Sequence, residues 1–225
     1  MLSASNMPLP EHTAAIAEAQ RPTTVLLLPS FIFVDGVTPD SVKDLVESFI
    51  SPSTTNTTRL SPEKPTVGIS GNPPVKEQPL NADSIPISNI PGFTTRPCPH
   101  KYLILMCSQR TRDARCGQSA PLLRREFERQ LRPLGLYRDL HDERPGGVGI
   151  YFISHVGGHK FSANVMVYRR AEGANAEASQ CIWLARVRPE DCEGIVKFTV
   201  LQGKVVKPER QLRGGFDREK GLVSW

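Results

Sequence analysis

Hydrophobic positions are distributed unevenly along the chain and separate two regions that can form a core from two that cannot. Residues 23–50 begin with the apolar run TTVLLLPSFIFV, which favours β-structure interrupted by a proline. A helix follows, opened by Thr38 as N-cap and Pro39 in the first turn, with Val42, Leu45, Val46 and Phe49 on one face. Residues 1–22 are expected to be mostly loose. Residues 51–92 are rich in Ser, Thr, Pro and Asn and have the composition of a linker.

Dense apolar patterning starts at Lys101 and predicts strands and helices in the order β-α-β-loop-β-β-α. The expected strands are YLILMC, GIYFIS, a segment around residues 164–168, and CIWLARV. One helix is expected from Ser119 or Ala120 through about Arg132, and a second from Pro189 to about Leu201. This order is that of a thioredoxin-like domain, except that the second strand leads into a loop where a helix is usual.

The pattern therefore predicts an α/β protein whose residues 97–225 form a thioredoxin-like, ferredoxin-type domain with a mixed sheet flanked by helices. Residues 51–96 are expected to form a disordered linker. The decapeptide VTPDSVKDLV from Val37 resembles VRPEDCEGIV from Val187, and each follows a strand-like run. If this is an internal repeat, residues 23–50 are the closing strand and helix of a truncated N-terminal thioredoxin-like half. The alternative is that any strand–proline–helix junction has this pattern.

Composition narrows the class of protein. The chain has 225 residues and a net charge of +5, with basic residues scattered and without the aromatic-interleaved stripe of a nucleic-acid binder. No apolar run reaches the length of a membrane span. Five cysteines without a signal peptide favour a reducing compartment. We expect a cytoplasmic location; a mitochondrial one is the alternative, although no basic residue precedes Arg21 in the way a presequence requires.

Two cysteines and two histidines follow the first two strands of the second region. Cys107 ends the first strand, and Cys116 follows an arginine-rich loop. His155 and His159 follow the second strand, and the glycine pair between them lets the chain turn tightly enough for both to face one site. Ligands gather at the carboxyl ends of neighbouring strands in open α/β sheets. These four residues are therefore our candidate metal ligands, although a lone His-x-x-x-His pair or a buried strand cysteine would each be a weak signal.

The residues alone leave the metal undecided. Zinc favours two cysteines with two histidines, but structural zinc sites usually space the cysteines by two to four residues, and here eight separate them. Copper would lack a distinctive axial ligand. A [2Fe-2S] cluster accommodates the longer loop, and two imidazoles would raise its reduction potential, as in Rieske centres. A structural zinc module and a thiol-disulfide oxidoreductase remain alternative functions, although no Cys-x-x-Cys opens the first helix.

Four sequence blocks resemble one known family: CSQRTRDARCGQSAP, SHVGGHKFSANVMVY, the segment from Trp183, and LRGGFDREKGLVSW. They are similar to the sucrase/ferredoxin-like family of thioredoxin-like ferredoxins, in particular its fungal "altered inheritance of mitochondria" branch. The resemblance implies a [2Fe-2S] cluster held by Cys107, Cys116, His155 and His159. It also implies an electron-transfer protein with an unidentified redox partner, and it favours this role over that of an enzyme with its own substrate. The C-terminus at Trp225 resembles the aromatic-ended tripeptide that cytosolic iron–sulfur assembly machinery recognises on clients.

Overall fold

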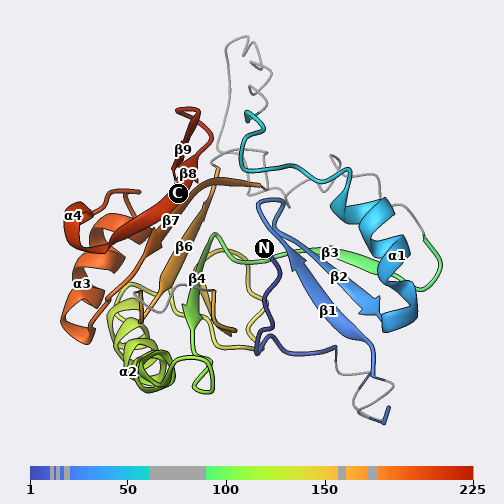
Figure 1. Ribbon diagram of the computed structural model, residues 1–225, viewed down its shortest axis with the longest axis horizontal. Coiled ribbons are helices and arrows are strands. Elements are labelled where there is room, and N and C mark those ends of the chain that lie inside the picture. The colour runs from blue at the N-terminus through green and yellow to red at the C-terminus, as the bar shows by residue number, and fades with distance from the viewer. Residues whose placement is uncertain are drawn as a thin grey trace, which may run out of the picture.

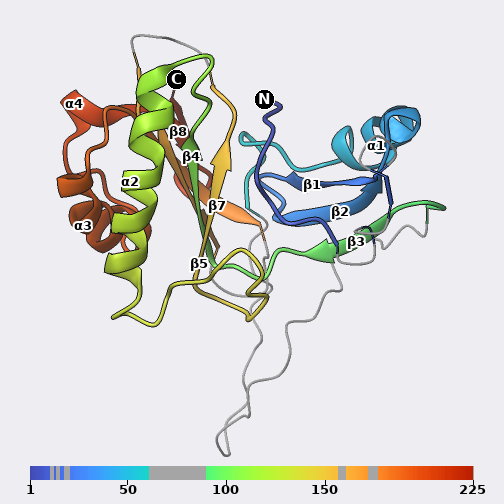
Figure 2. The ribbon, with the colours of Figure 1, turned by 90° about the horizontal axis from the view of Figure 1, so that it is seen from below.

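Two β-sheets lie face to face, with helices on their outer sides (Figures 1 and 2). The structure is a computed structural model, and it describes residues 1–10, 13, 16–17, 21–60, 90–156, 161–171 and 177–224. The smaller sheet belongs to the N-terminal part of the chain, and the larger sheet carries the candidate ligands. Among the described residues, no helix combines the length and the apolar character that crossing a bilayer requires.

The larger sheet has six strands in the order β5-β4-β6-β7-β8-β9. Only β4 and β5 run parallel; every other neighbouring pair is antiparallel. The first four strands have the order and directions of a thioredoxin-like sheet, which confirms the predicted α/β class. The strands are β4 (Tyr102–Cys107), β5 (Val148–Ile153), β6 (Val165–Arg170), β7 (Ala178–Leu184), β8 (Leu212–Asp217) and β9 (Leu222–Ser224).

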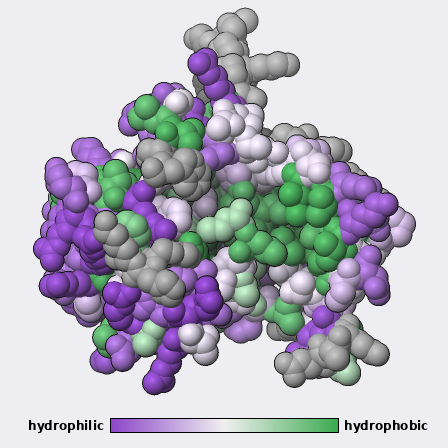
Figure 3. Space-filling model, viewed as in Figure 1, coloured by the Kyte–Doolittle hydropathy of each residue, from purple (hydrophilic) through white to green (hydrophobic). Residues whose placement is uncertain are grey.

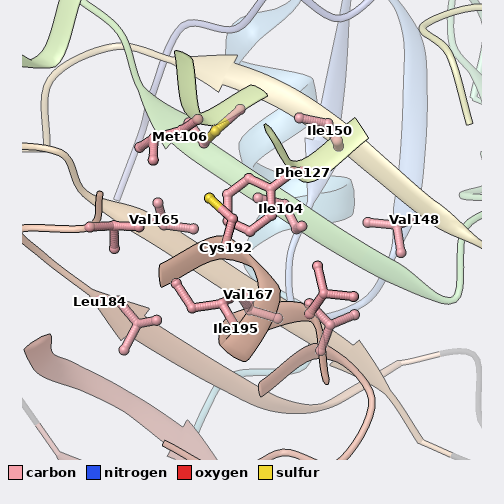
Figure 4. Packing of buried hydrophobic residues seen from close by; sticks show 14 of the residues in the cluster. Ile104, Met106, Phe127, Val148, Ile150, Val165, Val167, Leu184, Cys192 and Ile195 are labelled. Carbon is pink, nitrogen blue, oxygen red and sulfur yellow. The ribbon is translucent and has the colours of Figure 1, made fainter. Parts of the chain in front are cut away.

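Two helical segments cover one face of this sheet. Helix α2 (Ala114–Leu131) presents Leu123, Phe127 and Leu131 at four-residue spacing, and all three side chains are buried. The second segment spans residues 189–200 and contains α3 (Cys192–Gly194); a short helix α4 (Pro208–Gln211) precedes β8. Phe127 lies against Cys192 and the sheet residues in the core between these layers (Figure 4).

The other face of the larger sheet is covered by the smaller one. Strands β1 (Thr23–Leu27), β2 (Ile32–Val37) and β3 (Thr94–Pro97) form an antiparallel sheet. Phe31 and Phe33 are buried against Leu103, Leu105 and other residues of the larger sheet. The described residues between β5 and β6, 154–156 and 161–164, form no helix over this face, and the smaller sheet supplies the apolar cover that such a helix usually gives.

The two segments of the proposed internal repeat have the same local structure. Each opens with a 3-10 turn at a proline and continues through a short α-helix, α1 (Val42–Leu45) or α3, into a π-helical turn. At both N-termini a backbone amide donates to a side chain three residues on: Thr38 to Ser41 Oγ at 2.9 Å, and Arg188 to Asp191 Oδ2 at 3.0 Å. In both units the segment follows an antiparallel hairpin, whose second strand also pairs with a later strand. The origin of residues 23–50 as a truncated copy stays a prediction.

The repeated segments differ in how they are covered. Corresponding apolar positions are exposed in the first and buried in the second: Val42 (47%) against Cys192 (0%), Val46 (41%) against Val196 (3%), and Ile50 (44%) against Val200 (0%). The second segment packs against α2, and no helix in the described part of the chain plays this part for the first. On the face seen in Figure 3, apolar side chains gather over the small sheet and α1, whereas hydrophilic ones cover the part with α2 to α4.

Several boundaries differ from those expected. Helix α2 begins at Ala114, five or six residues before the predicted start, because Asp113 caps it in a stretch without apolar periodicity. Strand β3 crosses the predicted domain boundary at residue 97, so the end of the expected linker belongs to the smaller sheet. Strands β8 and β9 were not predicted at all. Residues 61–89 of the expected linker lie outside the described residues.

Candidate metal centre

The candidate ligands meet where β4 and β5 end. Because these strands are adjacent and parallel, Cys107 lies opposite Ile153 in the register, and the chain leaves both strands at the same edge of the sheet. Cys107 is the last residue of β4, and His155 comes two residues after β5. We call this edge of the larger sheet the site edge.

Cys116 reaches the site edge from the first turn of α2, where the prediction had placed it in a loop. The turn is fixed by Asp113, whose Oδ1 accepts a hydrogen bond from the Arg115 amide at 3.0 Å. The Asp113 backbone carbonyl accepts from the Cys116 amide, also at 3.0 Å. The Arg115 guanidinium in turn pairs with Asp113 Oδ2 at 2.9 Å, and these hydrogen bonds hold the pKa of the Asp113 carboxyl below its usual range. Asp113 therefore both caps the helix and pairs with a neighbouring arginine.

Three of the four predicted ligands lie close enough to share a metal. The Sγ atoms of Cys107 and Cys116 and a ring nitrogen of His155 all lie within 4.8 Å of one another. His155 Nδ1 is 3.4 Å from Cys107 Sγ and 4.0 Å from Cys116 Sγ. Both thiols are buried, whereas His155 is half-buried, so the group opens toward the surface on its histidine side. His159, with the glycine pair before it, lies outside the described residues.

The two thiols differ in what surrounds them. Burial, and next the neighbouring Cys116, raise the pKa of the Cys107 thiol far above its ordinary value. Backbone amides of Gln109 and Val156 donate to its sulfur and act in the opposite direction. Cys116 lies in the first turn of an 18-residue helix, at the positive end of the helix dipole. A cation bound between the two sulfurs would supply the compensating charge that both thiolates need.

Two contacts from outside the ligand set fix the backbone that leads to His155. Gln109, two residues after Cys107, accepts a hydrogen bond from the His155 amide through Oε1 at 3.0 Å. Residues 3–6, inside the segment expected to be loose, run along the outer edge of β5. There the Ser154 amide donates to the Ala4 carbonyl at 2.8 Å, and the Phe152 amide donates to Asn6 Oδ1 at 2.7 Å. The entry to the histidine loop is therefore held from both sides.

A polar cluster around Asn164, which the sequence did not suggest, joins the other end of the histidine loop to Cys107. The buried Asn164 accepts from the Cys107 amide through its backbone carbonyl at 3.1 Å and donates through Nδ2 to the Phe161 carbonyl at 2.6 Å. Its Oδ1 accepts from Arg213 Nη1 at 2.9 Å and from Trp183 Nε1 at 3.2 Å. These residues have no spacing typical of metal ligands. In the sequence they stand out only because they lie within the four blocks that resemble the sucrase/ferredoxin-like family.

Arg213 occupies a cage of aromatic rings beside Cys107. Its guanidinium carbon lies 4.1 Å from the centre of the Trp183 ring system and 4.7 Å from that of Phe161. Burial lowers the pKa of the Arg213 guanidinium, and a charge on Cys107 acts in the opposite direction. The caged guanidinium therefore lies within electrostatic reach of the candidate metal centre.

The other three cysteines, and His100, lie away from the site edge. Cys98 and His100 precede β4 and so lie at the opposite end of that strand from Cys107. Cys181 and Cys192 are buried in the core, and burial raises the pKa of the Cys181 thiol to about 12. Trp225 lies outside the described residues.

Strand order, helix placement and the thiol–imidazole group together define a thioredoxin-like α/β protein with a potential metal centre at one sheet edge. The model of the family described as sucrase/ferredoxin-like matches residues 1–214. The chain belongs to this family, as the sequence blocks predicted.

The curated relatives are fungal proteins. "Actin patches distal protein 1" of Saccharomyces cerevisiae is 32% identical over 188 residues, which cover 82% of this chain and 48% of the relative. "Altered inheritance of mitochondria protein 32" of Clavispora lusitaniae is 37% identical over 108 residues, which cover 48% of this chain and 33% of the relative. The matched part of this chain thus spans half or less of each relative. No significant match to a solved structure was found.

Proposed function

We propose that the chain binds a [2Fe-2S] cluster through Cys107, Cys116, His155 and His159 and carries electrons with it. The observation that supports this most is the buried thiol pair beside an imidazole, all within 4.8 Å, at the edge where a thioredoxin-like sheet gathers ligands. When bound, such a cluster exchanges one electron at a time. The donor set fits: two soft thiolates with imidazole are ligands that iron–sulfur centres use.

The residues around the site would stabilise the added electron. The amides of Gln109 and Val156 that point at the Cys107 sulfur are the kind of donors that raise the reduction potential of an iron–sulfur centre. The caged Arg213 and the N-terminus of α2 add positive potential on two sides. Both effects favour the reduced form, in which the centre carries one more negative charge.

A structural zinc module is the second candidate, favoured by how closely the three ligand atoms lie. Separations of 3.4 and 4.0 Å between the imidazole nitrogen and the two sulfurs suit a single tetrahedral ion. A thiol-disulfide oxidoreductase is less well supported. Its attacking cysteine would need a lowered pKa, whereas the pKa of Cys107 is raised, and both thiols are buried.

Purification under nitrogen, followed by metal analysis, distinguishes these functions. The proposal expects a red-brown protein with visible absorbance and two irons and two acid-labile sulfides per chain. C107S and C116S should lose the colour, and C181S, which removes a buried core cysteine, should keep it. A colourless protein that holds one zinc per chain would contradict the cluster. Iron retained in C107S/C116S together with a lost thiol-exchange activity would favour the oxidoreductase.

The histidines have their own test. H155C and H159C should each keep a cluster, lower its reduction potential and weaken the dependence of that potential on pH, because a thiolate donates more charge than imidazole and has no ring proton to lose. Unchanged potentials in both variants would remove these histidines from the ligand set. A cytoplasmic location and recognition by iron–sulfur assembly machinery through Trp225 stay predictions.

A further inference from the structure

Positive charge is concentrated around the site edge. The described segments that meet there are 107–118, 154–156, 161–164, 183–187 and 211–214, and their only carboxylate is Asp113, which is buried and paired with Arg115. Beyond these segments the charges are balanced: Asp191 pairs with Lys207, Glu190 pairs with Arg188, and the exposed Glu209 adjoins Arg210. The segments that meet at the site edge contain five arginines, which we call the basic rim: Arg110, Arg112, Arg115, Arg186 and Arg213.

Contacts tie the rim to the candidate metal centre from both sides. Arg110 packs directly over Gly117, one residue beyond Cys116. On the other side Arg186 lies over the Phe161 ring at 5.8 Å, and the same ring contacts the caged Arg213. Rim residues therefore lie on two sides of the centre: Arg110 beside the helix turn that carries Cys116, and Arg186 and Arg213 beside Phe161.

The outer arginines of the rim can form ion pairs with a partner protein. Arg110, Arg112 and Arg186 are exposed, and none of them forms an ion pair with a described residue. Arg213 differs because hydrogen bonding to Asn164 and stacking on Trp183 hold it in one orientation. Interfaces commonly combine these features: a fixed aromatic–arginine centre that makes close contact, and an outer ring of charge that guides approach.

At the opposite edge of the larger sheet, basic and acidic residues alternate and most of the carboxylates are paired. Asp142 pairs with Arg144, Glu143 with Arg96, Glu177 with Arg218 and Asp217 with Lys220. The charge at that edge is therefore largely compensated, whereas the outer arginines of the rim form no ion pair with a described residue. An uncompensated positive surface attracts an approaching anionic molecule before contact is made.

We propose that the basic rim is the docking surface for an acidic redox protein, which exchanges electrons with the centre beside Cys107 and His155. This inference rests on the proposed function and names the class of its partner. Nucleic acid is the other polyanion such a rim could meet. A protein is favoured because the arginines lie on two sides of a redox-capable group and do not extend along a stripe that could follow a phosphate backbone.

Reduction kinetics with donors of opposite charge test the proposal. The loaded protein is mixed with dithionite, reduced methyl viologen or flavodoxin hydroquinone, an acidic protein donor, and the loss of visible absorbance is followed at several salt concentrations. Each donor gives up one electron: the sulfur dioxide radical anion becomes sulfur dioxide, the viologen radical cation becomes the dication, and the anionic hydroquinone becomes the neutral semiquinone. Rates with the two anionic donors should fall as salt rises, whereas the rate with viologen should rise.

Charge reversal locates the effect. R110E/R186E should slow reduction by flavodoxin about tenfold or more at low salt and speed reduction by viologen. The matched control is K204E/K220E, which changes the net charge by the same amount at the opposite edge. Lys204 and Lys220 are both exposed; Lys204 adjoins Gly203, which lies against Arg169, and Lys220 lies beside Asp217 at the end of β8. K204E/K220E should change the flavodoxin rate less than about twofold. Equal effects of the two variants, or the same salt dependence for all three donors, would overturn the proposal.

A cluster-free measurement separates this inference from the proposed function. C107S/C116S protein, with its fold checked by circular dichroism, should still bind oxidised flavodoxin in calorimetry, and both added salt and R110E/R186E should weaken that binding. No loss of visible absorbance with any donor would refute the cluster and leave this binding test intact. Absence of flavodoxin binding, or tighter binding to a 20-base-pair DNA duplex, would overturn the assignment to an acidic protein.

Discussion

Replacing Asp113 by alanine tests whether one capping carboxylate places Cys116 in the centre. The side chain is 4% exposed, accepts the Arg115 amide at 3.0 Å and pairs with the Arg115 guanidinium at 2.9 Å. Loss of an N-cap acceptor costs about 1 kcal/mol. The guanidinium is 58% exposed, so solvent screens most of what its pairing adds to stability. D113A should therefore lower the free energy of unfolding by about 1–2 kcal/mol.

The matched control is D113S, which keeps an oxygen that can cap the helix and loses the ion pair. Urea unfolding of cluster-free protein, followed by circular dichroism, should place D113S about 1 kcal/mol above D113A in free energy of unfolding. Iron content after reconstitution should follow the same order, since a frayed first turn displaces Cys116. Equal stability of the two variants would show that the cap does not fix this turn.

Three further perturbations test the fold around the site. F31A should cost about 3–5 kcal/mol, because the ring is fully buried between the two sheets, whereas L122A, at a side chain 58% exposed, should cost less than about 0.5 kcal/mol in the same urea titration. G117A should lower both stability and iron content, since a Cβ there would lie 2.5 Å from a loop side chain; G194A, with no atom closer than 3.8 Å, should be neutral or stabilising. Burial lowers the pKa of His100 in the folded protein to about 4. As the pH falls below 6.5, the unfolded chain therefore binds a proton that the folded chain does not, which favours unfolding. Roughly 3 kcal/mol of stability should be lost between pH 6.5 and 4, and H100N should show a correspondingly smaller loss over that range.

The elements that carry the ligands could be predicted because their signals are local. YLILMC is apolar throughout, as a strand buried on both faces must be, and α2 has apolar residues at four-residue spacing. Parallel strands linked through a helix end at the same sheet edge, so Cys107 and His155 had to approach one another once the order β-α-β was recognised.

What could not be predicted depends on contacts between distant residues. The start of α2 is set by one capping aspartate in a run of polar residues, where periodicity gives no signal. Asn164 and Arg213 are ordinary polar residues in sequence. The pairing of β4 with β6 brings Asn164 beside Cys107, and the pairing of β6, β7 and β8 brings Arg213 to Asn164. The smaller sheet was expected as part of a separate half-domain, because the pattern of an apolar strand does not reveal which face of which sheet it covers.

Covering the larger sheet with a distant segment has a consequence for the order of folding. Phe31 and Phe33 precede β4 in the chain, yet they pack on a sheet whose strands β6 and β7 are synthesised much later. Ser3 and Ser154, whose hydroxyls lie 2.8 Å apart next to the histidine loop, are separated by 151 residues. Contacts of such long range form slowly and late. Residues 3–6 are thus among the last to reach their places, and the edge with the candidate metal centre is completed only when the distant segments around Ser154 and Arg213 have been made.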